Sequence, residues 1–303
     1  MSKIQFDSLI EGYFSYLKDI KRLAHRTVTD IKCTFKKVEE AIKDIRPGYK
    51  MWELSLDDYL QWMEIERKNG KSPHSINKEI SHIRGLLEYA WRNGRVDRNV
   101  LEGFFLKDAR NIKAPEVLTI DEVNNLLQVC DQKTKQERYN RLIILILYGC
   151  GLRTGELCAL DVQDIDKERQ EIFVRLGKGE IQRRVPVPGG VWIELLAYLS
   201  ERGGKRGPLF KTAIKKKRIS TKNVRDVVRE KSKQAKLNKK VTPKVLRHTF
   251  ASHLMDSGVD IAIISSLMGH STPRETGIYL HAFKNKKDAA VDKLSSQKQT
   301  EEE

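Results

Sequence analysis

The chain has 303 residues, 39% of them hydrophobic, and a formal net charge of +16. This length and composition exclude a disordered chain and allow two domains, each with its own core. The excess of Lys and Arg favours a polyanionic partner, with nucleic acid as the first choice. The longest apolar run, residues 142–147, is too short to span a bilayer. A membrane surface would need a basic amphipathic helix with aromatic residues, and none stands out, so no membrane partner is expected.

The first residues and the cysteines bear on location. The N-terminal stretch MSKIQFDS lacks the apolar segment of a secretory signal. The four cysteines include no C-x-x-C pair and are too sparse for a disulfide framework. We therefore expect reduced thiols and a cytoplasmic protein.

Apolar residues recur at helical spacing in four early segments, residues 4–22, 27–46, 55–63 and 73–93. In the third segment we expect Leu56, Tyr59, Leu60 and Met63 to face inward. These segments predict an all-α domain, residues 1–107. Basic side chains lie between the apolar stripes and either contact DNA phosphates or form an ordinary solvated surface. They are Lys21, Arg22, His25, Arg26, Lys68, Lys71, His74, Lys78 and Arg84.

The helical period fails at residues 108–115, a polar and basic stretch that ends in Pro, which predicts a linker. Residues 116–303 then predict a second, mixed α/β domain. Thr119 and Glu122 form a capping box, and an apolar helix covers residues 142–148. Strands are expected at 171–176 and 181–187, and further helices at 195–199, at 223–237 and from residue 243.

Arg153 follows Gly149-Cys-Gly-Leu, where two glycines allow a tight turn into a helix that starts near Thr154. The turn would place Arg153 beside a helix N-terminus, which favours an anion. Glu156 lies three residues further on and can hold this arginine in place. Lys178 lies between two glycines at the expected tip of the hairpin.

Residues 244–281 carry the most chemistry. Thr242-Pro243 starts a helix that places Arg247 at the edge of its buried stripe. Asp260 caps a second helix and Gly269 ends it, so His270 projects from a helix terminus. A third helix starts at Thr272-Pro273, with Tyr279 late in it. Each of these residues alone is more often structural, but from three consecutive elements they could converge on one point.

The pattern K-x-x-R…G-H…Y over residues 244–279 resembles the C-terminal signature of the tyrosine recombinases, the phage integrase and Xer group. The strings GLRTGEL and GKG…R-x-V-P also look like motifs of that family. The resemblance covers essentially the whole chain. It implies a mainly α fold with a small β-sheet: a two-domain DNA clamp of an N-terminal SAM-like helical bundle and a mixed α/β catalytic domain.

The resemblance also implies roles for five residues. Tyr279 would attack phosphorus and form a covalent 3′-phosphotyrosyl intermediate. Arg153 and Arg247 would clamp the phosphate, since guanidinium forks match phosphate oxygens. Lys178 would be the general acid for the 5′ oxygen, and His270 would donate to a non-bridging oxygen.

Lys244 stands where the family usually has His. It could bind phosphate, or act as a base if neighbouring arginines lower its pKa. We expect no cofactor and no metal. His248 and His253 are five residues apart, so they do not share a helix face as metal-binding histidines do.

The expected partner is double-stranded DNA with inverted half-sites. The resemblance implies a homo-oligomer on DNA, a dimer per site and a tetramer in synapsis, or assembly with a paralogous recombinase. A short C-terminal helix around residues 289–294 would dock on a neighbouring protomer, or else on its own domain. Type IB topoisomerase-like relaxation and a non-catalytic DNA-binding or architectural role are the alternatives. The biological role stays open among dimer resolution, integration or excision, and cointegrate resolution of a mobile element.

Overall fold

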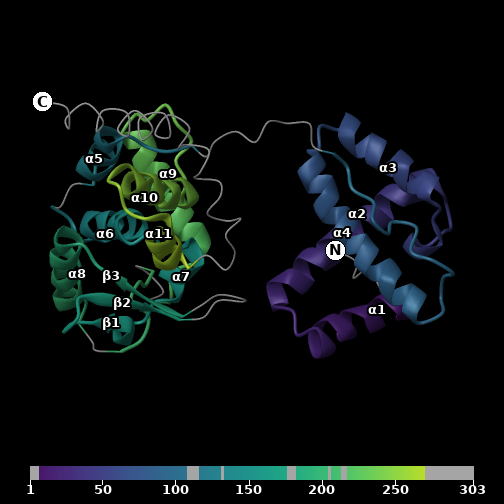
Figure 1. Ribbon diagram of the computed structural model, residues 1–303, viewed down its shortest axis with the longest axis horizontal. Coiled ribbons are helices and arrows are strands. Elements are labelled where there is room, and N and C mark those ends of the chain that lie inside the picture. Colours follow the sequence, from purple (N-terminus) through teal and green to yellow (C-terminus); the bar gives the residue numbers. More distant parts are fainter. Residues whose placement is uncertain are drawn as a thin grey trace, which may run out of the picture. The chain divides into compact units, whose positions relative to one another are not determined.

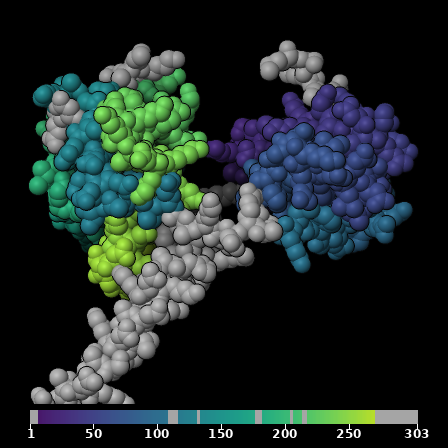
Figure 2. Space-filling model, turned by 90° about the horizontal axis from the view of Figure 1, so that it is seen from above, coloured from purple at the N-terminus to yellow at the C-terminus, as the bar shows by residue number. Residues whose placement is uncertain are grey.

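The computed structural model describes residues 7–107, 116–130, 133–175, 182–203, 206–212 and 217–269. The chain divides into two compact units, Met1–Asn111 and Ile112–Glu303 (Figure 1). In the space-filling view each unit is built from one continuous part of the chain, purple to blue in the first and teal to yellow in the second (Figure 2).

The first unit is a bundle of helices around an aromatic-rich core. Its elements are α1 (Ser8–Ser15), the π-helix η1 (Tyr16–Ile20), α2 (His25–Ile45), the 3-10 helix η2 (Met51–Glu53), α3 (Leu56–Lys68) and α4 (Pro73–Arg92). Phe35, Tyr59 and Trp62 are almost completely buried in this core. The predicted all-α architecture of this part of the chain is confirmed.

Side-chain caps fix where these helices begin. The Ser55 hydroxyl accepts the backbone N–H of Asp58 at 3.2 Å, and the Asp58 carboxylate accepts the backbone N–H of Ser55 at 2.8 Å. Ser72 caps α4, with Pro73 in the first turn. Each cap satisfies an N–H that has no partner inside the helix, so the start is encoded locally.

Two details of this unit differ from prediction. The first helix changes from α to π geometry at Tyr16 and does not continue regularly to residue 22. In α3, Leu56 and Leu60 are 38% and 40% exposed, although we expected both to face inward. The inward face is taken by Tyr59, Trp62 and Met63, which leaves the two leucines at its edge.

The second unit combines helices with a small antiparallel sheet. Its elements are α5 (Ile120–Gln128), α6 (Lys135–Gly149), α7 (Thr154–Ala159), the 3-10 helix η3 (Val162–Asp164), β1 (Ile165–Asp166), β2 (Glu171–Val174), β3 (Arg183–Pro186), α8 (Gly189–Arg202), α9 (Thr221–Gln234), α10 (Pro243–Asp256) and α11 (Ile261–Met268). The strands follow the order β1-β2-β3, with Val174 opposite Arg183. The short strand β1 was not predicted, because two residues are too few to show an alternating pattern.

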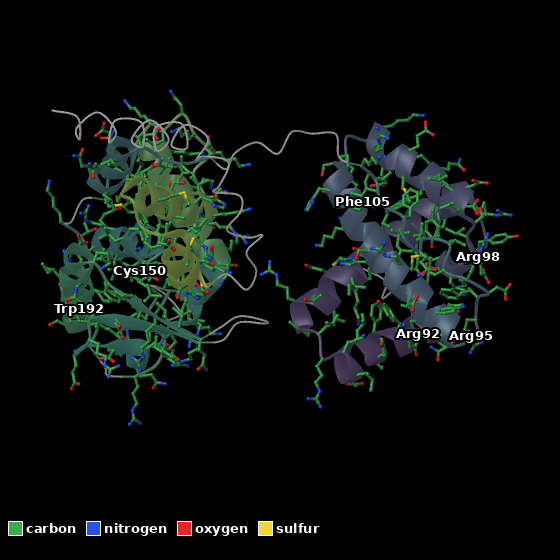
Figure 3. The ribbon with its side chains drawn as sticks, viewed as in Figure 1. Arg92, Arg95, Arg98, Phe105, Cys150 and Trp192 are labelled. Carbon is green, nitrogen blue, oxygen red and sulfur yellow. The ribbon has the colours of Figure 1, made fainter. Side chains whose placement is uncertain are left out.

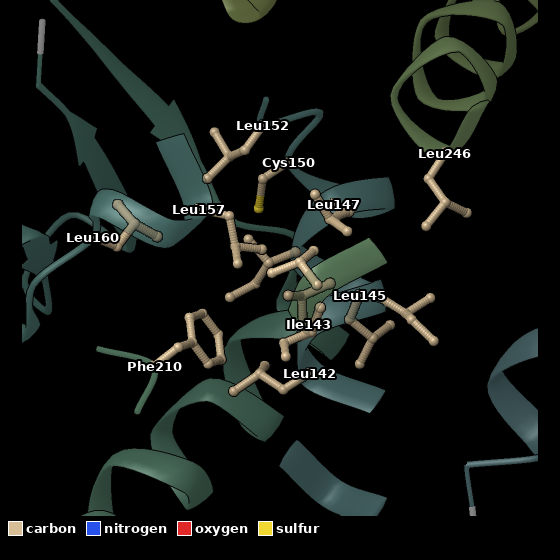
Figure 4. Close-up of a cluster of buried hydrophobic side chains, with 14 of the residues drawn as sticks. Leu142, Ile143, Leu145, Leu147, Cys150, Leu152, Leu157, Leu160, Phe210 and Leu246 are labelled. Carbon is tan, nitrogen blue, oxygen red and sulfur yellow. The ribbon is translucent and has the colours of Figure 1, made fainter. Parts of the chain in front are cut away.

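Helix α6 forms the centre of this unit. It packs against α5, α7, α8, α9 and α10, which explains why its apolar run is continuous rather than amphipathic. Figure 4 shows its leucines and Ile143 meeting Leu157 of α7, Phe210 and, from α10, Leu246. The core therefore fixes α7 and α10, the two helices that carry the candidate site.

No helix in the described part of the chain has the length and apolar character needed to cross a membrane.

Candidate active site

Arg153 lies at the start of α7, as predicted. Gly151 turns the chain with a φ of 60°, and Arg153 follows as the N-cap residue. Its own N–H donates to Glu156 Oε2 at 2.7 Å, and its Nη1 donates to Glu156 Oε1 at 3.1 Å. The expected contact between Arg153 and Glu156 is therefore present.

Arg247 projects from α10 into the same region. Thr242 caps this helix and Pro243 occupies its first turn. The Arg247 side chain is 9% exposed, and its Nη1 donates to the carbonyl of Gly151 at 2.7 Å. Its Nη2 donates to the carbonyl of Met268 at 2.7 Å. The guanidinium thus ties α10 to the turn before α7 and to the end of α11.

The C-terminal end of α11 is where the two arginines meet. Gly269 ends the helix in the left-handed conformation, with φ 64° and ψ 50°. Arg153 Nη2 donates to the Gly269 carbonyl at 3.0 Å, and Arg247 donates to that of Met268. These terminal carbonyls carry partial negative charge, which attracts cations. His270 is the next residue in the sequence.

Glu156 lies at the centre of the charged cluster, and its side chain is 5% exposed. Arg183 of β3 donates to both carboxylate oxygens, at 2.8 Å to Oε1 and 2.9 Å to Oε2. Arg247 Nη1 lies 3.8 Å from Oε2. Burial opposes ionisation, but the hydrogen bonds and charge of Arg183, together with Arg153 N–H and Arg247, hold the pKa of Glu156 below its ordinary value of 4.5.

Sequence reasoning missed Arg183. The string R-x-V-P was noted as family-like, but its arginine received no role. A signal was available, since strand alternation places Arg183 on the same face as Val185, and both are buried. An arginine among inward-facing apolar residues requires a buried acidic partner.

Lys244 is exposed in the first turn of α10, three residues before Arg247. Lys178, His270 and Tyr279 lie outside the described residues. The structure thus brings Arg153 and Arg247 together and places Lys244 one helical turn from Arg247. The expected third helix from Thr272 also falls outside the described part.

Several basic side chains of the first unit serve the fold. Lys71 pairs with Glu66 and, at 2.6 Å, with Glu79, while Arg84 Nη1 donates to the Phe104 carbonyl at 3.3 Å. Exposed arginines instead gather where α4 ends and the following turn begins (Figure 3). They are Arg92, Arg95 and Arg98.

Among the described residues, the cluster in the second unit has more positive than negative charge, because the guanidiniums of Arg153, Arg183 and Arg247 surround the carboxylate of Glu156. Arg153 is its most accessible member, with 28% of its side chain exposed against 7% for Arg183. Forked, permanently charged donors suit the oxygens of a phosphate. The second unit therefore carries a cluster whose chemistry suits a phosphate-bearing ligand.

Comparisons with known proteins identify the family. The model of the "Phage integrase family" matches residues 116–286, and that of the "Phage integrase, N-terminal SAM-like domain" matches residues 10–94. Tyrosine recombinase XerA of Thermococcus kodakarensis is 36% identical over 236 residues, which cover 76% of this chain and 79% of that protein.

Two solved structures share the fold. The Tn1549 transposon integrase in complex with transposon right end DNA matches with a TM-score of 0.74 and 21% identity, over 95% of this chain and 100% of that one. A lambda integrase tetramer bound to a Holliday junction matches with a TM-score of 0.72 and 17% identity, over 90% of this chain and 76% of that one.

The chain belongs to the phage integrase family, the tyrosine recombinases, and resembles its Xer members. It is an enzyme of site-specific DNA recombination, which cleaves and rejoins DNA strands. The predicted fold class, a SAM-like helical domain with a mainly helical catalytic domain and a small sheet, is confirmed.

Proposed function

We propose that this recombinase acts through a covalent 3′-phosphotyrosyl intermediate, with Tyr279 as the nucleophile. The Tyr279 hydroxyl gives up its proton, to Lys244 in its neutral form or to water if Lys244 serves only as a cation. Its oxygen then forms a bond to the scissile phosphorus as the bond from phosphorus to the 5′ oxygen breaks. Lys178 gives the departing 5′ oxygen its proton. The reverse steps, with a new 5′ hydroxyl as the attacking group, rejoin the strand. The covalent bond conserves the energy of the phosphodiester, so no ATP is required.

The single observation that carries this proposal is the meeting of Arg153 and Arg247 at the end of α11. Two guanidiniums from distant parts of the sequence donate to adjacent carbonyls, those of Gly269 and Met268. They suit the two non-bridging oxygens, on which negative charge increases in the transition state. His270, the next residue, would add a further donor there.

Lys244 keeps two proposed roles. Its place one turn before Arg247 suits an added cation near the phosphate. As an alternative, it would take the proton from Tyr279, in the role of the usual histidine.

We further propose that the DNA substrate carries inverted half-sites, each bound by one protomer, with four protomers in the synaptic complex. The lambda integrase tetramer on a Holliday junction supports this arrangement by analogy of fold. The protomers would be identical chains or would include a paralogous recombinase. Residues 1–107 would form the DNA-binding domain, joined by a linker at 108–115 to the catalytic domain at 116–303.

The decisive experiment uses a nicked suicide duplex, on which cleavage traps the covalent adduct. The wild-type protein should become joined to a 3′ phosphate. Tyr279→Phe should form no adduct and should still shift the duplex in a gel, because the ring is kept and only the nucleophilic oxygen is lost. Tyr49→Phe, at an exposed tyrosine of the first unit, is the matched control and should react normally. Adduct from the Tyr279 variant would show that another residue attacks. No adduct from the wild type on its own site would favour the architectural alternative.

A further inference from the structure

Arg183 uses all three of its guanidinium nitrogens in hydrogen bonds within the protein. Its Nη1 and Nη2 donate to the two carboxylate oxygens of Glu156, and its Nε donates to the Leu267 carbonyl at 2.7 Å. With 7% of its side chain exposed, it is too deeply buried to serve as a DNA contact. Its donors point into the protein, toward one carboxylate and the end of one helix.

Arg183 also fills the space beneath the last turn of α11. A Cβ added at Gly269 would lie 2.7 Å from Arg183 Nη1 and 3.0 Å from its Cζ. Position 269 therefore favours glycine for two reasons: its backbone has a positive φ, and a side chain there would collide with Arg183. The guanidinium sets the position of the turn whose carbonyls Arg153 and Arg247 contact.

The charges show what would follow from losing Arg183. Glu156 would remain a buried carboxylate, and among the residues that the structure describes its nearest cations would be Arg153 Nη1 at 3.1 Å and Arg247 Nη1 at 3.8 Å. A carboxylate and a phosphate compete for the same guanidinium fork. An unpaired buried carboxylate is costly, so Glu156 would draw these arginines toward itself.

We propose that Arg183 is a positioning residue for recombination. By pairing with the Glu156 carboxylate, it keeps that carboxylate from drawing Arg153 and Arg247 away from the scissile phosphate. This inference rests on the proposed function, because it takes those two arginines as the phosphate clamp. Glu156 then orients Arg153 by accepting one hydrogen bond from the Arg153 side chain, and its negative charge does not cancel the positive charge of the two arginines.

The test compares cleavage of two duplexes by Arg183→Met and by wild type. One duplex carries the normal phosphodiester at the scissile position, and the other carries a methylphosphonate, which lacks the negative charge. Arg184→Met is the matched control, because Arg184 is the next residue of β3 and is exposed, paired with Asp166 at 3.0 Å. A merely structural loss would slow both duplexes equally.

On the phosphodiester we expect Arg183→Met to lose roughly a hundredfold in cleavage rate, the scale of a small misplacement of catalytic groups. The loss of cleavage rate on the methylphosphonate should be several times smaller, because this uncharged group depends less on Arg153 and Arg247 to neutralise charge. Arg184→Met should cleave both duplexes like wild type. Equal losses on both duplexes for Arg183→Met would overturn the inference.

A second measurement removes the competing carboxylate. Glu156→Gln combined with Arg183→Met should cleave the phosphodiester faster than Arg183→Met alone, because no buried charge is left to capture the clamp. If Arg183→Met alone does not fold, the double variant is compared with wild type on the two duplexes instead. A double variant no faster than the single variant, or equally impaired on both duplexes, would refute the inference. Failure of wild type to form the Tyr279 adduct would instead refute the proposed function.

Discussion

Glu156 is the residue on which the charge balance of the site depends. Its carboxylate accepts from Arg183 and Arg153 while almost completely buried, and its pKa is held below 4.5. A carboxyl whose pKa is lower in the folded than in the unfolded protein stabilises the fold in its ionised form. That stabilisation is fully present above about pH 4.5 and is lost as the pH falls through the folded-state pKa.

We therefore predict that Glu156→Gln lowers the free energy of unfolding at pH 7 by about 3–5 kcal/mol, the usual cost of breaking a buried ion pair. Below pH 4.5 the difference from wild type should shrink, because the unfolded protein then takes up the proton first, and it should be lost as the pH falls through the folded-state pKa of Glu156. Urea unfolding of both proteins between pH 7 and pH 3 measures this difference. A difference that stays constant over that range would contradict the role given to the ionised carboxylate.

At the scale of elements, the turn between α6 and α7 joins the core to the site. Gly151 has a φ of 60°, and a Cβ there would lie 2.3 Å from Phe250 Cδ1 on α10. Its carbonyl accepts from Arg247 at 2.7 Å. The close approach of this turn to α10 therefore sets the separation of Arg153 and Arg247.

Gly151→Ala should destabilise the protein by more than about 1 kcal/mol, because the added methyl group suits neither the positive φ nor the Phe250 ring. Cleavage should fall more than DNA binding, since Arg247 loses its place. Gly155→Ala is the matched control: its Cβ would meet nothing within 4 Å, and it lies within α7. That variant should be equally stable or more stable. Thermal unfolding and suicide-substrate cleavage compare the two, and a silent Gly151→Ala would show that the turn can relax.

Much of the fold could be predicted because helix starts are local signals. The caps at Thr119 and Thr242 each use a side chain within three residues of the N–H it accepts, and both helix starts were predicted. Arg153 was also found locally, from glycines that permit one sharp turn. Sequence reasoning could go this far because neither signal depends on the rest of the fold.

The remaining features depend on contacts between distant segments. Arg183 acquires its role from Glu156, 27 residues earlier, and from Leu267, 84 residues later, so strand alternation could show that it faces inward but not which groups it binds. The inward face of α3 was misjudged for a related reason: Leu56 and Leu60 are as apolar as their neighbours, and only packing decides that Trp62 is buried instead. The roles of Lys178, His270 and Tyr279 stay predictions.

At the scale of the whole molecule, the segment after Tyr279 carries the prediction about assembly. In the helix predicted around residues 289–294, Ala290, Val291 and Leu294 would form a short apolar stripe, and so short a helix would not be stable alone in water. We predict that truncation after Lys287 leaves binding to one half-site nearly unchanged. Cooperative filling of the second half-site and strand exchange should both fall sharply.

Gel shifts on single and paired half-sites, with a recombination assay, measure these effects. Truncation after Gln297 is the control, because it removes only the polar tail and keeps the apolar stripe. Normal cooperativity and normal recombination in the shorter protein would mean that the segment docks on its own domain.

The two units have separate hydrophobic cores: among the described residues, one cluster of buried side chains comes from residues 10–106 and two come from residues 118–268. If both units bind DNA, as proposed, then binding of the second unit becomes intramolecular once the first is bound, and it is governed by an effective concentration. Each unit would then need only weak affinity for DNA, while the whole chain would bind tightly. One unit would be able to release DNA while the other stays bound, so the enzyme would exchange strands without losing its substrate.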